Sequence, residues 1–186
     1  VSTPAVVLKL YHHLGLGVVR SLGRLGIPVY CVDPDQWSPG INSRYCRDKF
    51  IWDVDESSPE ANVEFLLRVG KKIGKRSVLF HTADETAQLV ADYADVLKEW
   101  FIFPVKSAPL VRTLVSKKEM YFLAKEQDIP TAETLFPKSR AEVIAFLEMV
   151  KFPIMLKGID GRLLEQRKGK KMVIVNRADR MIEYQA

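Results

Sequence analysis

Short apolar segments alternate with amphipathic stretches through the first hundred residues of this 186-residue sequence. Residues 5–10 (AVVLKL) and 27–32 (IPVYCV) have the composition of buried strands, and residues 15–25 between them place leucine and valine on one helical face. A strand, a helix and a strand within about 30 residues form a βαβ unit, whose two strands run parallel. This pattern restricts the first part of the chain to an open α/β sheet.

The same alternation continues to about residue 103. We expect further strands at residues 48–52, 77–81 and 101–103, and helices at residues 59–72 and from the turn 82–85 to about residue 98. In that turn Thr82 is the predicted N-cap, with Glu85 three residues later.

The pattern changes after residue 106, where we place a domain boundary. Residues 107–186 predict helices at 107–115, 116–127 and 139–150, of which the last two begin at the N-caps Ser116 and Ser139. They also predict strands at 131–136, 152–157 and 170–175, and a last helix from Arg177. The predicted fold is therefore an open, mostly parallel, Rossmann-like α/β domain over residues 1–106, followed by an incomplete α+β segment over residues 107–186.

Composition excludes several classes of protein. Hydrophobic residues make up 47% and charged residues 27%, which are globular values. No apolar run approaches the roughly 18 residues that span a bilayer, and no basic region opens a signal peptide, so we expect a cytoplasmic protein without a membrane partner. Residues 157–186 contain eight Lys and Arg against four Asp and Glu, which suggests an anionic ligand. Nucleic acid is a poor candidate because Tyr184 is the only aromatic residue there.

Glycines follow the first predicted strand, in residues 11–17. Backbone N–H groups and a helix dipole could hold a phosphate or carboxylate there, so Gly15 and Gly17 are candidate substrate-binding residues. A dinucleotide fingerprint needs a third glycine where this sequence has Arg20, so a nicotinamide or flavin site is disfavoured. The alternative is a tight turn that only glycine can make.

Ligands of open α/β sheets bind beyond the carboxyl ends of the strands. We expect residues 43–45 and 82–85 to gather there with the first loop. Arg44 could bind a carboxylate or phosphate through both ends of its guanidinium, and Asp84 and Glu85 could hold an amine or cap a helix. Of the three histidines, two are adjacent and would face opposite ways in a strand, so we predict no metal site in this chain.

Two lysines stand in contexts that suit a nucleoside triphosphate. Lys118 lies early in a predicted helix, and Lys157 closes the apolar strand FPIMLK before a loop that contains Gly158 and Gly161. Two ammonium groups can offset phosphate charge, and a mobile loop can close over the phosphates. Taken singly, each lysine could equally be a solvated surface residue.

These segments resemble a known family. Residues 116–136 (SKKEMYFLAKEQDIPTAETLF) resemble the opening of an ATP-grasp domain, although Asp128 stands where the family carries glycine. Residues 152–161 (FPIMLKGIDG) are similar to the strand before its glycine-rich loop. The first 106 residues resemble the Rossmann-like domain that precedes ATP-grasp, and residues 15–33 and 43–52 are similar to its carbamoyl-phosphate-synthetase-like and amino-acid-ligase branches.

The resemblance implies a function. Lys118 and Lys157 would contact the phosphates of ATP, and residues 158–169 would cover them, with Arg162, Arg167 and Lys168 where family loops are richer in glycine. Mg²⁺ would be held by an acid and a Glu-x-Asn motif expected beyond the end of this chain. The parent would join a small-molecule carboxylate to an amine through an acyl phosphate. This chain alone would be inactive, and a homodimer is possible.

Two alternatives remain open from the sequence. The first is a non-catalytic α/β domain that binds a nucleotide or another metabolite. The second is an oxidoreductase that uses the loop at residues 11–17.

Overall fold

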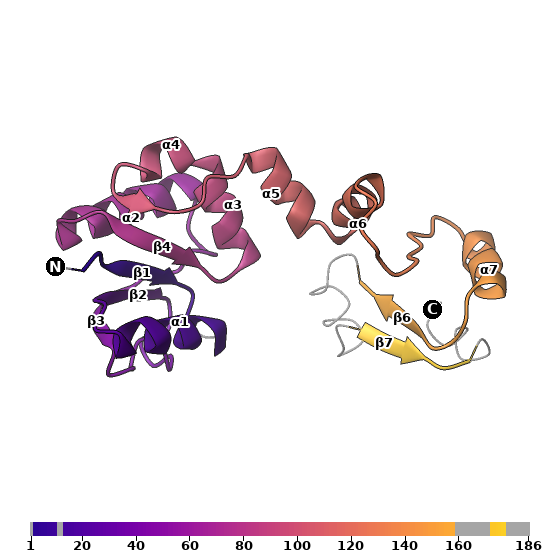
Figure 1. Ribbon diagram of the computed structural model, residues 1–186, viewed down its shortest axis with the longest axis horizontal. Coiled ribbons are helices and arrows are strands. Elements are labelled where there is room, and N and C mark those ends of the chain that lie inside the picture. The colour runs from indigo at the N-terminus through magenta and orange to yellow at the C-terminus, as the bar shows by residue number, and fades with distance from the viewer. Residues whose placement is uncertain (1, 11–12, 159–171, 178–186) are drawn as a thin grey trace. The chain divides into compact units, whose positions relative to one another are not determined.

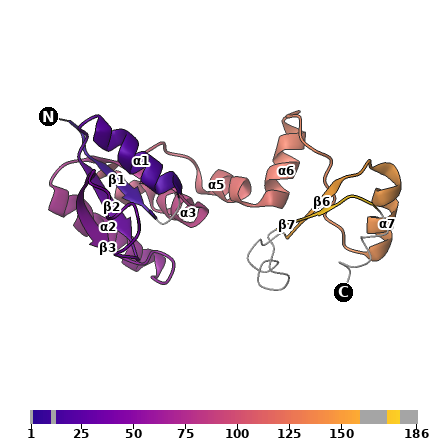
Figure 2. The same cartoon turned by 90° about the horizontal axis from the view of Figure 1, so that it is seen from below.

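A computed structural model of the protein describes residues 2–10, 13–158 and 172–177. The chain divides into two compact units, Val1–Arg112 and Thr113–Ala186, which are described separately (Figure 1, Figure 2). The boundary predicted near residue 106 precedes this division by a short stretch and stays a prediction.

The described part of the first unit contains one five-stranded sheet. Its strands are β1 (Ala5–Leu8), β2 (Val29–Asp33), β3 (Cys46–Ile51), β4 (Ser77–His81) and β5 (Phe101–Ile102), in the spatial order β3-β2-β1-β4-β5. All neighbouring strands are parallel, and β1 pairs with β2 from Ala5 opposite Val29 to Leu8 opposite Val32. The predicted α/β class with an open parallel sheet is confirmed.

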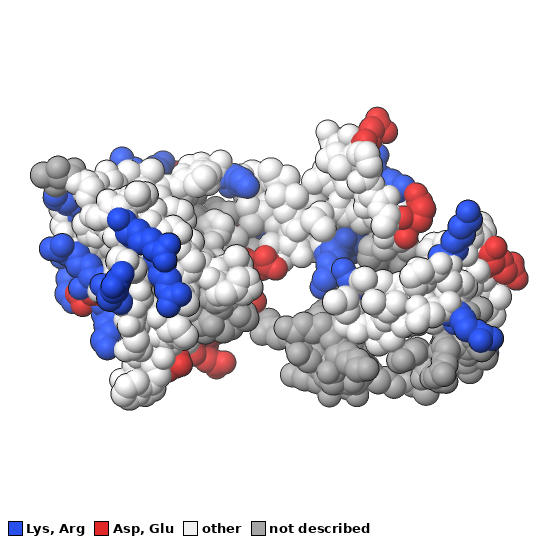
Figure 3. Space-filling model, turned by 60° about the horizontal axis from the view of Figure 1, so that its bottom comes forward, with Lys and Arg blue, Asp and Glu red and all other residues white. Residues whose placement is uncertain are grey.

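Five helices lie between these strands or follow β5 directly in the described chain. They are α1 (His13–Arg24), α2 (Pro59–Ile73), α3 (Asp84–Asp92), α4 (Ala94–Leu97) and α5 (Ala108–Val115), the last of which crosses the division between the units. Gly74 ends α2 with φ of 70°, and Gly26 follows α1 with φ of 72°, a backbone region that favours glycine. Basic side chains gather on the face of this unit that carries α1 and β3 (Figure 3).

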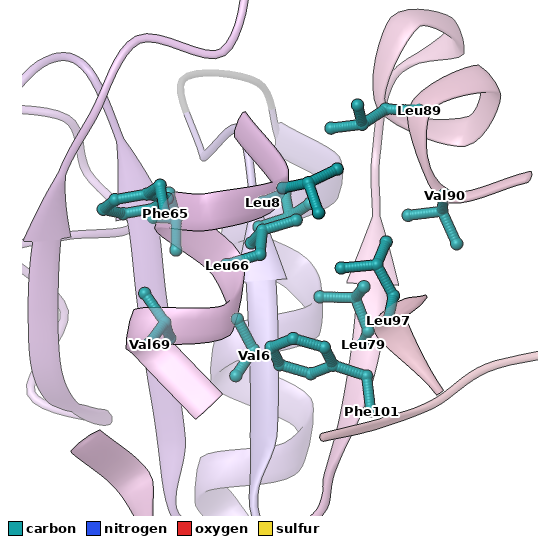
Figure 4. Packing of buried hydrophobic residues seen from close by; sticks show 12 residues of the cluster. Val6, Leu8, Phe65, Leu66, Val69, Leu79, Leu89, Val90, Leu97 and Phe101 are labelled. Atoms are coloured by element: carbon teal, nitrogen blue, oxygen red, sulfur yellow. The ribbon is translucent and has the colours of Figure 1, made fainter. Parts of the chain in front are cut away.

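Helices cover both faces of the sheet because the side chains of each strand alternate. Val6 and Leu8 of β1 belong to the larger buried cluster with residues of α2, α3 and α4 (Figure 4). Val7 points into the second cluster, where Val19 of α1 packs against it. Both faces are therefore buried, as expected for strands that read as continuous apolar runs.

The second unit contains two helices and two strands among its described residues. They are α6 (Lys117–Glu126), α7 (Arg140–Met149), β6 (Ile154–Lys157) and β7 (Met172–Val175), and the two strands pair antiparallel. Ser116 and Ser139 cap the helices, each accepting a hydrogen bond from the backbone N–H three residues on. These caps are as predicted.

Three predictions of secondary structure are wrong. Residues 131–136 form no strand, since they follow Pro130, precede Pro137 and pair with no neighbour in the described chain. Thr82 does not cap α3, because its hydroxyl donates instead to the carbonyl oxygens of Leu8 and Lys9, at 3.0 and 2.6 Å. The helix predicted to reach residue 98 breaks at Tyr93, which separates α3 from α4. The helix predicted from Arg177 lies outside the described residues.

Candidate functional site

The strand order places a change of direction between β1 and β4. The chain runs from β1 outwards through β2 and β3, and then returns to form β4 on the other side of β1. Such a point in an open parallel sheet leaves a crevice at the carboxyl ends of the strands, where ligands of this class of fold bind. The loops that follow β1, β3 and β4 meet here, through contacts of Lys9 with Asp55 and Glu85.

Lys9 is the residue on which these three loops converge. It follows β1 directly, its side chain is 5% exposed, and its φ is 59°, which is uncommon for any residue except glycine. Its Nζ lies 2.7 Å from Oδ1 of Asp55, after β3, and 3.2 Å from Oε2 of Glu85, after β4. One buried ammonium group therefore ties together three loops that are distant in sequence.

The charges around Lys9 keep it protonated. Burial is the largest single influence and acts to lower the pKa of Lys9, but the hydrogen bonds and charges of Asp55 and Glu85 outweigh it and raise the pKa above 10.5. Lys9 is thus an ammonium at neutral pH and does not act as a base. Each carboxylate is about half exposed, at 43% for Asp55 and 49% for Glu85, so both also face solvent.

Asp33 fixes the backbone of the same loop. It ends β2, is 1% exposed, and accepts hydrogen bonds from the backbone N–H groups of Leu10 and Asp35. Sequence reasoning missed Lys9, Asp33 and Asp55 as members of this edge. The available signal was a single lysine near the end of the apolar run AVVLKL, which the prediction treated as part of a strand.

The two candidate glycines lie within α1 and not in a turn before it. A Cβ atom on Gly15 would lie 2.8 Å from the carbonyl oxygen of Lys9 and 2.9 Å from Cα of Leu10. Glycine is therefore required at Gly15 because the helix packs closely under the Lys9 loop. Gly17 is exposed and a Cβ there would meet nothing within 4 Å. The alternative of a tight turn at these glycines is therefore wrong.

The other first-unit candidates fall at opposite edges of the sheet. Asp84 and Glu85 begin α3 at the carboxyl edge, as predicted, and Glu85 contacts Lys9. Arg44 does not join them, because it precedes β3 and the strands are parallel, so it lies at the amino edge. The expectation that residues 43–45 gather with the other loops is wrong.

Histidines and metal binding add little at this edge. His81 ends β4. Partial burial is the main cause that lowers the pKa of His81, and the positive charge of Lys106 acts in the same direction. His12 lies outside the described residues. Among the residues that the structure describes, no group of three or more His, Cys, Asp or Glu could hold a metal ion.

A second candidate site lies on one face of the β6–β7 pair. Met155 is opposite Ile174 and Lys157 is opposite Met172, and all four side chains are exposed on this face. The other face carries the less exposed partners, including Val175, which is 2% exposed. An apolar surface therefore ends in an ammonium group, an arrangement that can accept a molecule with a flat ring at one end and an anionic group at the other.

The remaining ATP-site candidates lie before and after β6 in the second unit. Lys118 is the second residue of α6 and is partly buried, and Gly158 follows Lys157 directly. Gly161 and the rest of the predicted loop over the phosphates lie outside the described residues. That Lys118 and Lys157 contact one nucleotide stays a prediction.

Comparisons with known proteins connect this geometry to a class of enzymes. No protein-family model matches the sequence. The chain is 28% identical over 130 residues to a D-aspartate ligase of Enterococcus faecium (strain Aus0004), an alignment that covers 66% of this chain and 30% of that protein.

Solved structures are similar over nearly the whole chain. An ADP complex of N5-carboxyaminoimidazole ribonucleotide synthetase matches with a TM-score of 0.66 and 13% identity, covering 100% of this chain and 45% of that one. The ATP complex of the Aspergillus clavatus enzyme matches with a TM-score of 0.63 and 22% identity, covering 97% and 43%. An L-amino acid ligase of Bacillus licheniformis matches with a TM-score of 0.61 and 13% identity, covering 98% and 41%.

These neighbours are synthetases and ligases, two of them solved with ADP or ATP. The chain has the α/β fold of a part of these proteins, which is the fold that the resemblance to ATP-grasp proteins predicted. It spans less than half the length of the proteins it matches. None of the described helices combines the length and apolar character needed to cross a membrane.

Proposed function

We propose that this chain is the N-terminal part of an ATP-dependent carboxylate–amine ligase. A substrate carboxylate would attack the γ-phosphate of ATP, ADP would leave, and an amine would then displace phosphate from the acyl phosphate. The fold of the N-terminal part of ATP-grasp ligases supports this proposal, as does the similarity to a D-aspartate ligase. A cytoplasmic location, a carbamoyl-phosphate-synthetase-like subtype and a homodimer remain expectations from the sequence.

The exposed face of β6 and β7 is the observation that carries the proposal. Met155, Met172 and Ile174 are 50%, 50% and 58% exposed, and Lys157 lies beside them at the end of β6. We infer that the three apolar side chains pack on the base of ATP, while Lys157 binds its phosphates. Lys118 would add a second ammonium group, so that positioning and charge stabilisation do the catalytic work.

The carboxyl edge of the first unit would hold a substrate. Asp55 and Glu85 present half-exposed carboxylates at this edge, beside the ammonium group of Lys9. Carboxylates that also face solvent suit the ammonium group of an amine substrate better than a substrate carboxylate. Mg²⁺ would neutralise phosphate charge in the complete enzyme.

Nucleotide binding to the full 186-residue chain tests the proposal. Isothermal titration calorimetry with ATP should show that Lys157→Ala weakens binding by about tenfold or more, the loss expected for a charge-assisted contact. Lys118→Ala should lose less, because Lys117 beside it can substitute. Lys151→Ala is the matched control, since Lys151 is an exposed lysine of the same unit that precedes β6.

Three outcomes would contradict the proposal. Unchanged ATP affinity in Lys157→Ala would remove the assignment of this face. Binding of NAD(P) but not ATP would favour an oxidoreductase, and binding of a metabolite with neither nucleotide would favour a sensor domain. As a control for folding, the far-UV circular dichroism spectrum of Lys157→Ala should match that of the wild type, because Lys157 is exposed.

A further inference from the structure

A group of basic side chains lies on α1, on β3 and just before β3. All five are exposed, and none forms an ion pair with a carboxylate among the described residues; they are Arg20, Arg24, Arg44, Arg47 and Lys49. Asp48, the one acid among them in sequence, binds Lys72 of α2 at 3.0 Å. The blue surface over α1 and β3 in Figure 3 shows this concentration of positive charge.

Tyr45 lies at the centre of the group. Nη2 of Arg44 donates a hydrogen bond to Oη of Tyr45 at 2.7 Å, and the guanidinium carbon lies 4.8 Å from the ring centroid. The end of α1 packs against the same ring, since a Cβ on Gly23 would lie 2.3 Å from Cβ of Tyr45. Arg24 follows Gly23 in α1 and also interacts with the phenol of Tyr45.

The titration of Tyr45 reflects this arrangement. The hydrogen bond from Arg44 is the main cause that lowers the pKa of Tyr45, and a hydrogen bond and the charge of Arg24 act in the same direction against desolvation. The phenol oxygen thus experiences two positive charges.

The guanidinium groups of Arg24 and Arg44 repel each other, so other contacts must stabilise each of them. Arg24 ends α1, where the helix dipole favours a cation, and Arg44 stacks on Tyr45. Neither contact uses more than a few of the N–H donors of the two guanidinium groups. The unused donors of a guanidinium fork match the oxygens of a phosphate, with which arginine forms paired hydrogen bonds.

We propose that Arg24, Arg44 and Tyr45 form a binding site for a phosphate-class oxyanion at the amino edge of the first unit's sheet. Arg20, Arg47 and Lys49 would raise the local concentration of anions by their field. The ligand would be a phosphate or pyrophosphate group, either free or attached to a small metabolite. This site does not depend on the proposed ligase function, and it gives Arg44 a role separate from the substrate edge.

Titration of the full chain with pyrophosphate at low ionic strength tests the site. Calorimetry should show that Arg24→Gln and Arg44→Gln each weaken binding by about tenfold, and that the double variant weakens it further than either. Pyrophosphate should also raise the pKa of Tyr45, seen as a shift in phenolate absorbance that Tyr45→Phe abolishes. A phosphomonoester titrated in parallel shows whether an attached group is accepted.

Matched variants separate this site from other anion binding. Lys75→Gln removes an exposed base at the same edge, just before β4, and should not change the affinity. Lys151→Ala, an exposed lysine of the second unit, should also leave pyrophosphate binding unchanged. The proposal is overturned if pyrophosphate does not bind, if Lys75→Gln or Lys151→Ala loses as much affinity as the arginine variants, or if a short single-stranded oligonucleotide binds more tightly than pyrophosphate through the same arginines.

Discussion

The two compact units differ in how much apolar surface they bury. The first unit has a core on each face of its sheet, with side chains such as Val7, Leu8 and Leu97 fully buried. In the described part of the second unit, Val175 is the one buried apolar side chain, whereas Met149 is 78% exposed. The comparison teaches that the first unit is stabilised by packing, whereas the described elements of the second depend on helix caps and strand pairing.

The largest expected effect tests whether packing is confined to the first unit. Leu8→Ala should lower the free energy of unfolding by roughly 2–5 kcal/mol, because it leaves a cavity between β1 and its helices. Met149→Ala should change it by less than about 0.5 kcal/mol, since the side chain is exposed.

Urea unfolding measures this pair of variants. All three tryptophans lie in the first unit, so their fluorescence reports on that unit, while circular dichroism follows the helices of both. Equal losses in the two variants would show that the second unit also has an important core, and the comparison would fail.

The next effect concerns the close packing of α1 under the Lys9 loop. Gly15→Ala should destabilise the protein by roughly 1–3 kcal/mol, because the new Cβ would meet backbone atoms that cannot move aside easily. Gly17→Ala, two residues along the same helix, should stabilise it by about 0.5–1 kcal/mol through helix propensity. Thermal unfolding of the two variants measures the difference, and effects of the same sign would contradict the described packing.

Lys9 links the stability of the first unit to pH. Its pKa is raised in the folded protein because the two carboxylates outweigh burial, so its ion pairs stabilise fully below the ordinary value of 10.5. This contribution is lost as pH rises through the raised folded value. Lys9→Met should lower stability by roughly 1–3 kcal/mol near neutral pH, and the difference from the wild type should shrink above about pH 10.5.

Urea unfolding at a series of pH values measures the effect of Lys9→Met. Lys106→Met is the control, because Lys106 is an exposed lysine of the same unit with no ion pair to a carboxylate among the described residues. If the difference in free energy of unfolding between Lys9→Met and the wild type stays constant up to strongly alkaline pH, the ammonium charge of Lys9 has no role in stability.

Much of the first unit could be predicted from local pattern. The strand Ser77–His81 and the edge strand at Phe101 have the predicted positions, because apolar runs bounded by turn residues determine them locally. The role of Lys9 could not be predicted, since it depends on Asp55 and Glu85, which the fold brings from other loops. Arg44 was assigned to the wrong edge because residues 34–44 carry the chain back to the start of β3, and a loop's course is not encoded by periodicity.

In the second unit the helix caps could be predicted from the sequence, whereas strand pairing could not. Ser116 and Ser139 were identified as caps because capping depends on a few adjacent residues. The strand expected at residues 131–136 failed because a strand needs a partner, and pairing is not visible in a single segment. The two ATP-site lysines were selected by motif and order, so their meeting at one nucleotide depends on tertiary structure that the motif does not specify.

The smallest expected effect compares matched N-caps in the two units. Ser58 caps α2 by accepting from the N–H of Ala61 at 3.2 Å, and Ser116 caps α6 by accepting from the N–H of Glu119 at 3.3 Å. Replacing either serine by alanine should cost about 0.5–1 kcal/mol. In α2, whose apolar face is buried, the loss should appear in global unfolding. In α6, which has no buried residue, it should appear as faster amide hydrogen exchange within the helix alone. Exchange in α6 that slows or speeds only together with the first unit would show that the two units unfold as one, and would break the distinction between a packed unit and a locally stabilised one.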